Sequence, residues 1–84
     1  MTDVMPAVKQ FILDQYLPGE NPANLTPTTP LVSGGILDSL AILDLVAFLE
    51  KTFGIELEAH EVDRDRLDTL ERIAVLVDGK RGRS

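Results

Sequence analysis

The chain has no cysteine and no tryptophan, and its other aromatic residues are few. Without cysteine, no disulfide framework, no CxxC zinc site and no thiol nucleophile can form. The sequence has no apolar run long enough to span a membrane, and no basic stretch followed by an apolar one at its N-terminus. We therefore expect a soluble protein of the cytoplasm without a membrane partner.

Basic residues are outnumbered, with 8 Lys and Arg against 14 Asp and Glu and a net charge of -6. This acidity disfavours nucleic acid and anionic membranes and favours partner proteins with basic patches. A chain of 84 residues has room for one modest core and little room for a deep enclosed active site. We predict a non-enzyme, a single domain over residues 1–84, and a monomer.

Apolar residues at helical spacing predict an all-α fold of three main helices and one short one. The helices are expected at residues 3–17, 38–53, 59–64 (the short one) and 68–77. Met5, Val8 and Ile12 share a face of the first helix, and Gly54 is the expected stop of the second.

The last predicted helix has Asp68 and Glu71 at the spacing of a capping box. Gly79 is its expected stop, and residues 80–84 are expected to form a frayed tail. Residues 18–37 contain four prolines and cannot be helical throughout, but Leu25, Leu31 and other apolar residues anchor them. We therefore expect this long first loop to wrap across the bundle.

The second predicted helix carries more apolar side chains than one buried stripe requires. A first stripe, expected to face the core, comprises Ile42, Leu45, Leu49 and Phe53. A second stripe comprises Leu40, Leu43 and Ala47. Either this helix is buried all round, or the second stripe is an exposed docking face for partner proteins. In the latter case Asp38, Asp44 and Glu50 border that face and select basic partners.

Ser39 stands at the expected start of that helix and allows two interpretations. It can be the N-cap, for which serine is a common residue. It can also carry a phosphate group, because a phosphodiester there meets free backbone N–H groups and the positive end of the helix dipole. Gly34 and Gly35 relieve crowding upstream, so a large partner could approach the hydroxyl. The residues alone permit modification of Ser39 without identifying the modifying group.

Residues 35–40, Gly-Ile-Leu-Asp-Ser-Leu, followed by an apolar helix, resemble the phosphopantetheine attachment motif of acyl and peptidyl (aminoacyl) carrier proteins. The likeness covers most of the chain. It includes the first helix, a long loop containing Thr29-Pro30-Leu31, and a second helix that ends in residues 50–55, Glu-Lys-Thr-Phe-Gly-Ile. The resemblance implies the helical bundle of a discrete, type II carrier.

The resemblance also implies roles for individual residues. Ser39 takes a 4'-phosphopantetheine arm from coenzyme A through a separate phosphopantetheinyl transferase, and Asp38 helps to place metal and substrate in that complex. Acyl or aminoacyl cargo is held as a thioester on the arm, loaded by a ligase or transferase and used by downstream synthases or transferases. The residues implied to lie on the recognition helix are Leu40, Leu43, Asp44, Ala47 and Glu50.

Two departures bear on the pathway. Carriers of fatty acid synthesis usually have an acid two residues after the serine, where this chain has Ala41. Residues 63–66, Asp-Arg-Asp-Arg, lengthen the region of the short helix. Both favour polyketide, nonribosomal peptide or aminoacyl pathways, with fatty acid synthesis as the alternative. The rival from another class is an unmodified helical protein-interaction module.

Other candidate sites are weaker. An enzyme that pairs Ser39 with His60 lacks the Gly-x-Ser-x-Gly motif of hydrolases. Glu56, Glu58 and Glu61 lack the spacing of a calcium-binding loop, so they are expected to form a solvated face. We therefore predict neither catalytic residues nor a metal site.

Overall fold

The computed structural model describes residues 3–81, and every regular element in that range is helical. The elements are α1 (Val4–Tyr16), η1 (Pro22–Asn24), α2 (Ser39–Phe53), η2 (Ala59–Glu61) and α3 (Leu70–Arg81). The prediction of an all-α bundle with three main helices is confirmed. The short helix η2 is a single 3-10 turn, closed by a capping box between Glu58 and Glu61, and is shorter than predicted. The additional 3-10 turn η1 was not predicted.

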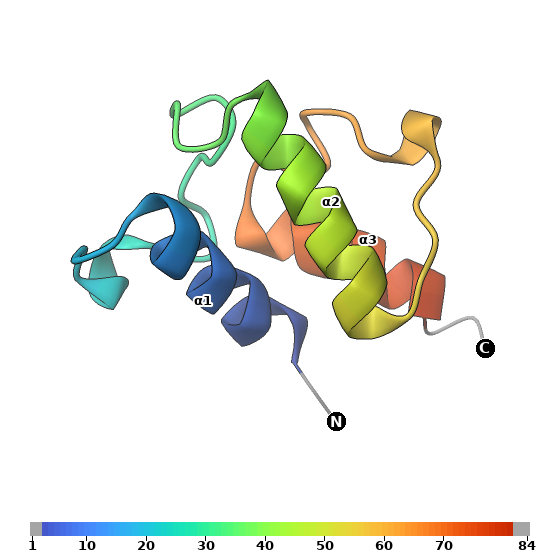
Figure 1. Ribbon diagram of the computed structural model, residues 1–84, viewed down its shortest axis with the longest axis horizontal. Helices are drawn as coiled ribbons and strands as arrows, with labels where there is room; N and C mark the ends of the chain where they lie inside the picture. Colours follow the sequence, from blue (N-terminus) through green and yellow to red (C-terminus); the bar gives the residue numbers. More distant parts are fainter. Residues whose placement is uncertain (1–2, 82–84) are drawn as a thin grey trace.

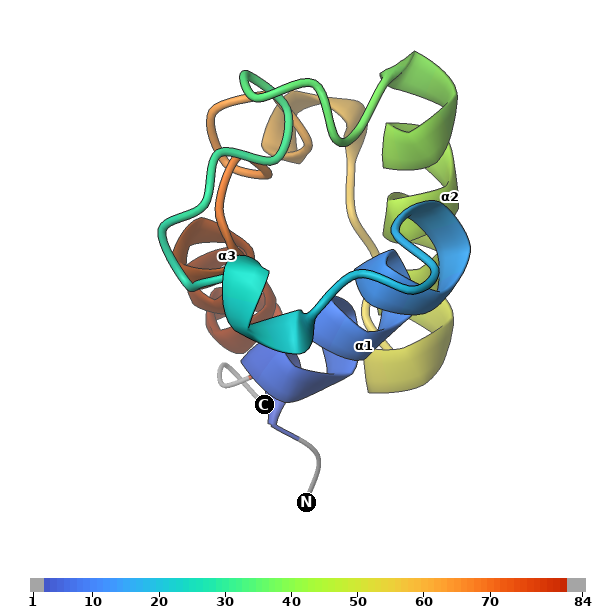
Figure 2. The same cartoon turned by 90° about the vertical axis from the view of Figure 1, so that its left-hand side faces the viewer.

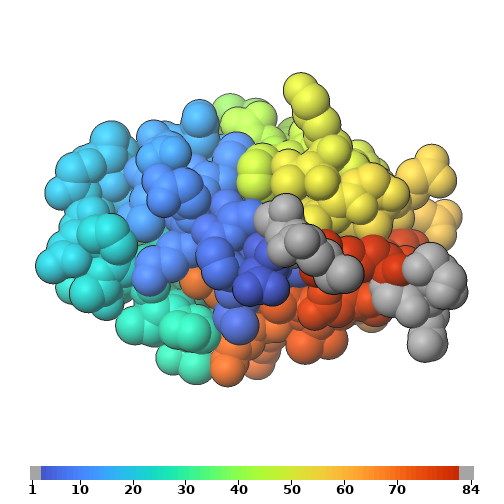
Figure 3. Space-filling view, turned by 90° about the horizontal axis from the view of Figure 1, so that it is seen from below, coloured from blue at the N-terminus to red at the C-terminus, as the bar shows by residue number. Residues whose placement is uncertain are grey.

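The three main helices surround one core, and both α1 and α2 pack against α3 (Figures 1 and 2). Seen from below, α1 lies beside the first loop and α3 (Figure 3). The first loop and the segment that precedes α3 meet near the N-terminal end of α2 (Figures 1 and 2). That end of the molecule therefore gathers three segments that are distant in the sequence.

The core takes side chains from all three main helices and from the loops. On α1, Val4, Val8 and Ile12 recur every four residues and are nearly inaccessible. Met5, which was expected on this stripe, is 37% exposed because it lies about a quarter turn from Val4. Leu13 of α1 is buried as well. The buried residues of the other segments are Leu25, Leu31, Leu37, Ala41, Leu45, Leu49, Ile55, Leu67, Leu70, Ile73 and Val77. Each large aliphatic side chain contributes about 1.5–3 kcal/mol by its burial.

The long first loop crosses the bundle as predicted, held by three buried leucines. Leu25, Leu31 and Leu37 are each at most 2% exposed. The N–H of Leu31 donates to the carbonyl of Asp68 at 2.6 Å, and the N–H of Leu37 donates to the carbonyl of Leu31 at 2.9 Å. The first bond joins the loop to the residues just before α3, and the second closes the end of the loop on itself.

The start of α3 differs from the predicted capping box. The side chain of Thr69 caps the helix, because its hydroxyl accepts the N–H of Arg72 at 3.1 Å. The carboxylate of Asp68 is directed instead to Val32 and Ser33 in the first loop. The predicted pairing of Asp68 with Glu71 is therefore wrong, and Asp68 makes a tertiary contact.

The end of α3 also differs from the prediction. The helix passes through Gly79 and includes Lys80 and Arg81, which were expected to belong to a frayed tail. Lys80 Nζ lies 2.9 Å from a carboxylate oxygen of Glu61, and the Arg81 guanidinium lies 5.0 Å from the centre of the Phe53 ring. These contacts hold the last turn against η2 and α2. The rest of the expected tail, residues 82–84, lies outside the described residues.

Gly79 and Gly54, which lie near the ends of α3 and α2, together test whether Gly79 lies within its helix or ends it. Gly79→Ala should stabilise the fold by about 0.5–1 kcal/mol, because glycine in a helix interior is unfavourable relative to alanine. An alanine side chain there meets no neighbouring atom within 4 Å. Gly54→Ala should destabilise by about 1–2 kcal/mol, because Gly54 ends α2 with a left-handed φ of 65°. Urea unfolding measures both, and destabilisation by Gly79→Ala would restore Gly79 as a helix stop.

Candidate functional site

The N-terminus of α2 is capped by Asp38 and begins with Ser39. Asp38 is extended, with φ -93° and ψ -173°, and its Oδ1 accepts the backbone N–H of Ala41 at 2.8 Å. This is the geometry of an N-cap aspartate. Ser39 is therefore not the cap, which removes the first of the two interpretations of this residue.

The Ser39 hydroxyl is available for chemistry. The residue is exposed, and its side chain makes no hydrogen bond within residues 3–81. It adjoins a hollow of about 250 Å³ at the meeting point of the three segments. The hollow is lined by Val32, Gly35, Leu37, Asp38, Ser39, Ile42 and Arg64. A primary alcohol in this position can be reached by an enzyme without unfolding of α2.

The loop before Ser39 is fixed by the carboxylate of Asp68. Oδ1 accepts the backbone N–H groups of Val32 and Ser33, each at 2.9 Å, and Oδ2 accepts the Ser33 hydroxyl at 2.9 Å. The pKa of the Asp68 carboxyl is lowered, mainly by the hydrogen bond from the Ser33 N–H. The Ser33 hydroxyl, the Val32 N–H and the charge of Arg72 lower it further. The ionised carboxylate thus ties the residues ahead of α2 to the start of α3.

Gly34 and Gly35 serve the backbone of this loop. A Cβ on Gly34 would collide with the carbonyl oxygen of Pro30. Gly35 has a left-handed φ of 84°, and its N–H donates to the carbonyl of Val32 at 3.1 Å. The local geometry accounts for both glycines, so they provide no separate argument for partner access.

The two stripes of α2 lie on different faces, as the exposed alternative predicted. Leu40 and Leu43 are 72% and 65% exposed, and Ala47 is exposed beside them. Leu45 and Leu49 are fully buried. The predicted core stripe is only partly correct, since Ile42 and Phe53 are half-buried and the small residue Ala41 takes a fully buried place. We call Leu40, Leu43 and Ala47 the outer face of α2.

Besides Asp38, the two other acidic residues expected along this face also accept hydrogen bonds within the protein. Asp44 Oδ2 accepts the hydroxyl of Tyr16 at 3.1 Å. Burial, and then this carboxylate, raise the pKa of Tyr16 above its usual value of 10.0. Glu50 Oε2 accepts the backbone N–H of Leu57 at 2.9 Å, which holds the chain after α2. Asp44 therefore carries its charge in a fixed position, and Glu50 also has a structural role.

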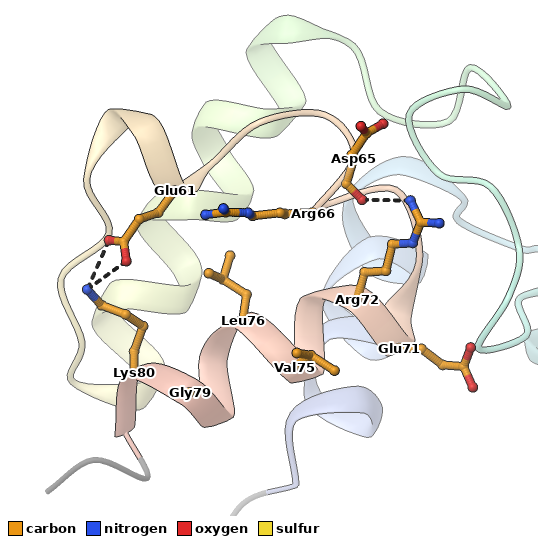
Figure 4. A pocket seen from close by; sticks show the side chains of 9 residues that line it. All are labelled: Glu61, Asp65, Arg66, Glu71, Arg72, Val75, Leu76, Gly79 and Lys80. Atoms are coloured by element: carbon orange, nitrogen blue, oxygen red, sulfur yellow. Dashed lines mark hydrogen bonds and ion pairs between the residues drawn. The ribbon is translucent and has the colours of Figure 1, made fainter.

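Two other features lie apart from Ser39. A hollow of about 610 Å³ lies over α3, with Val75 and Leu76 below and the ion pair of Glu61 and Lys80 at one end (Figure 4). This hollow and the hollow beside Ser39 share no lining residue. Ligand atoms of Glu58, His60 and Glu61 lie within 4.8 Å of one another at η2, but Lys80 already contacts both carboxylate oxygens of Glu61.

A family model described as the phosphopantetheine attachment site matches residues 17–77, more than half of the chain. The chain belongs to this family. Its members are carrier domains that hold a covalent 4'-phosphopantetheine group and generally interact with phosphopantetheinyl transferases and partner enzymes; they are not catalysts. Searches of curated proteins and of solved structures returned no significant match. No helix within residues 3–81 is both long and apolar enough to cross a bilayer.

The residues at the start of α2 fit the cofactor of a carrier protein. Ser39 offers an exposed, unbonded hydroxyl, and Asp38 fixes the backbone that presents it. The adjoining hollow gives room for the base of an arm, and Arg64 is one of its lining residues. No rearrangement of the described residues is needed to make the hydroxyl accessible.

Sequence reasoning did not find three residues of this region. Asp68 was expected in a local capping box, Arg64 only at the end of the short helix, and no contact was expected for Tyr16. Their contacts or positions depend on tertiary folding, since Tyr16 lies 28 residues from Asp44 and Asp68 lies 35 residues from Ser33. The buried Leu67 next to Asp68 was the available signal that this segment returns to the core.

The pKa of Asp68 gives a pH-dependent prediction. Because it is lower in the folded chain than in the unfolded chain, ionised Asp68 stabilises the fold above the unfolded pKa, and this stability is lost as the pH falls through the folded pKa. Asp68→Asn should therefore lower Tm near neutral pH and flatten the fall of Tm between about pH 5 and pH 2. The control Asp14→Asn, on the exposed side of α1, should show the same dependence of Tm on pH as the wild type. An unchanged profile for Asp68→Asn would refute the role of this carboxylate.

Proposed function

We propose that Ser39 is the phosphopantetheine attachment residue of this carrier protein. The observation that carries the proposal is the exposed hydroxyl of Ser39, left without an intramolecular hydrogen bond because Asp38 caps the helix. A serine that capped α2 itself would have its oxygen engaged by a backbone N–H. The match to the family extends over this residue and its surroundings.

The chain's part in attachment is to present a nucleophile. The Ser39 oxygen forms a bond to the phosphorus of coenzyme A that carries the pantetheine, the bond from that phosphorus to the nucleotide breaks, and the hydroxyl proton passes to a base outside this chain. Asp38 Oδ1 remains on the Ala41 N–H and keeps Ser39 at the helix start. The second oxygen of Asp38 is left to help place a metal ion of the transferase complex. Once attached, the arm supplies a thiol that holds cargo as a thioester.

The outer face of α2 is proposed to contact the partner enzymes. These are the phosphopantetheinyl transferase, a loading ligase or transferase, and downstream synthases or transferases. Leu40 and Leu43 supply exposed apolar area close to Ser39, and Asp44 supplies a fixed negative charge. The net charge of -6 favours basic docking surfaces and disfavours nucleic acid. Cytoplasmic location and a monomeric state belong to the same proposal.

The cargo is proposed to be acyl or aminoacyl, in polyketide or nonribosomal peptide type biosynthesis. The support is Ala41, which is 3% exposed at the position where carriers of fatty acid synthesis usually have an acid. An ionised side chain at this buried place would lose hydration without a partner, so the packing of this chain is adapted to a small apolar residue. Fatty acid synthesis is the alternative within the carrier class.

The test of attachment is the intact mass of the protein after incubation with coenzyme A and a broad-specificity phosphopantetheinyl transferase. The wild type should gain one phosphopantetheine, and Ser39→Ala should gain none while it keeps its helical circular dichroism. Ser33→Ala is the matched control and should still be modified, because it keeps Ser39 and the bond from the backbone N–H of residue 33 to Asp68. Modification of Ser39→Ala would move the site elsewhere. A folded wild type that gains no mass would favour the unmodified interaction module.

Leu43 and Leu45 test the outer face with neighbouring leucines. Leu43→Arg should change the free energy of unfolding by at most about 0.5 kcal/mol, because Leu43 is exposed, yet it should raise the KM of the transferase for this carrier. Leu45→Ala should cost about 2–5 kcal/mol, because that side chain is fully buried. Equal transferase kinetics for Leu43→Arg and the wild type would exclude Leu43 from this docking surface.

A further inference from the structure

The hollow beside Ser39 has one cationic lining residue. Val32, Leu37 and Ile42 contribute apolar side chains to it, whereas Arg64 comes from the segment between η2 and α3. In Figure 2 this segment runs beside the first loop, to which Asp68 is hydrogen-bonded. The fold therefore brings an arginine from a distant part of the sequence to the hollow that Ser39 also lines.

Arg64 differs from the neighbouring arginines in having no partner within residues 3–81. Arg66 lies 3.7 Å from a carboxylate oxygen of Asp63, and Arg72 donates to the carbonyl oxygen of Asp65 at 3.1 Å. Arg64 stands between these two aspartates in the sequence, yet its side chain forms no ion pair with either. Its charge is not used by the fold of the described residues.

A phosphodiester on Ser39 would place a permanent negative charge at this hollow. The only charged side chain that lines the hollow besides Arg64 is the carboxylate of Asp38, which repels such a charge. A guanidinium is always protonated and bonds two phosphate oxygens at once, so it is well suited to this group. The long side chain of an exposed arginine can turn to meet the phosphate without movement of the backbone.

We propose that Arg64 pairs with the phosphodiester carried by Ser39 and so holds the base of the arm against the hollow. Arg64 is a positioning residue, and the inference rests on the proposed attachment at Ser39. The pairing joins the η2–α3 segment to the start of α2 only in the modified protein. The modified carrier thus differs from the unmodified one at residues that are distant in sequence from Ser39.

The test compares modified and unmodified protein by nuclear magnetic resonance, after mass spectrometry has confirmed attachment. In the wild type, attachment should shift the side-chain Nε–H resonance of Arg64. The 31P resonance of the modified protein should move in Arg64→Gln and stay in place in Arg66→Gln, the matched control whose native partner is Asp63. Both effects should shrink as the salt concentration rises from about 0.05 to 0.5 M, because ions screen an exposed pair.

The outcomes separate the two proposals. Suppose that attachment occurs at Ser39, that the 31P resonance is the same in the wild type and Arg64→Gln, and that the Arg64 Nε–H resonance does not shift. This result would overturn the inference and leave the proposed function intact. Absence of attachment would overturn both. If the transferase does not accept Arg64→Gln, the Nε–H resonance of wild-type Arg64 before and after modification decides the question by itself.

Discussion

The carboxylate of Asp68 is the contact on which the arrangement of the site depends most. The first loop is long and contains four prolines, so helical hydrogen bonds cannot order it. Asp68 accepts the N–H groups of Val32 and Ser33, and its backbone carbonyl accepts the N–H of Leu31. A single residue thus satisfies three consecutive loop amides that the loop itself leaves unpaired. Leu31 and Leu37, both buried, fix the same segment from the core side.

Once the loop is held, the position of Ser39 follows from local rules. Leu37 is buried, Asp38 is extended and caps the helix, and Ser39 begins α2 on the surface. The side chains then separate by the period of the helix, with Leu45 inside and Leu43 outside. The Ser39 hydroxyl, the outer face and the hollow lined in part by Arg64 consequently lie on or beside one helix, α2.

The parts of the structure that repeat locally could be predicted from the sequence. The approximate bounds of α1 and α2 and the stop at Gly54 follow from helical spacing and glycine conformation. The exposure of Leu43 was one of two alternatives that the sequence left open. Contacts between distant segments could not be predicted, because several partners satisfy the same local pattern. Asp68 has the spacing of a cap, but Thr69 fills that role and leaves the carboxylate for the loop. Gly79 looks like a stop only when the contacts of the following Lys80 and Arg81 are unknown.

If this chain works as a carrier through Ser39, the protein in its own cells should carry the modification. Fragment-ion mass spectrometry of the peptide that contains residues 34–50, isolated from those cells, would show it. We expect phosphopantetheine on Ser39, with part of the population bearing a thioester-linked acyl or aminoacyl group. A peptide found only with a free Ser39 hydroxyl, under conditions where known carriers of the same cells are modified, would contradict it.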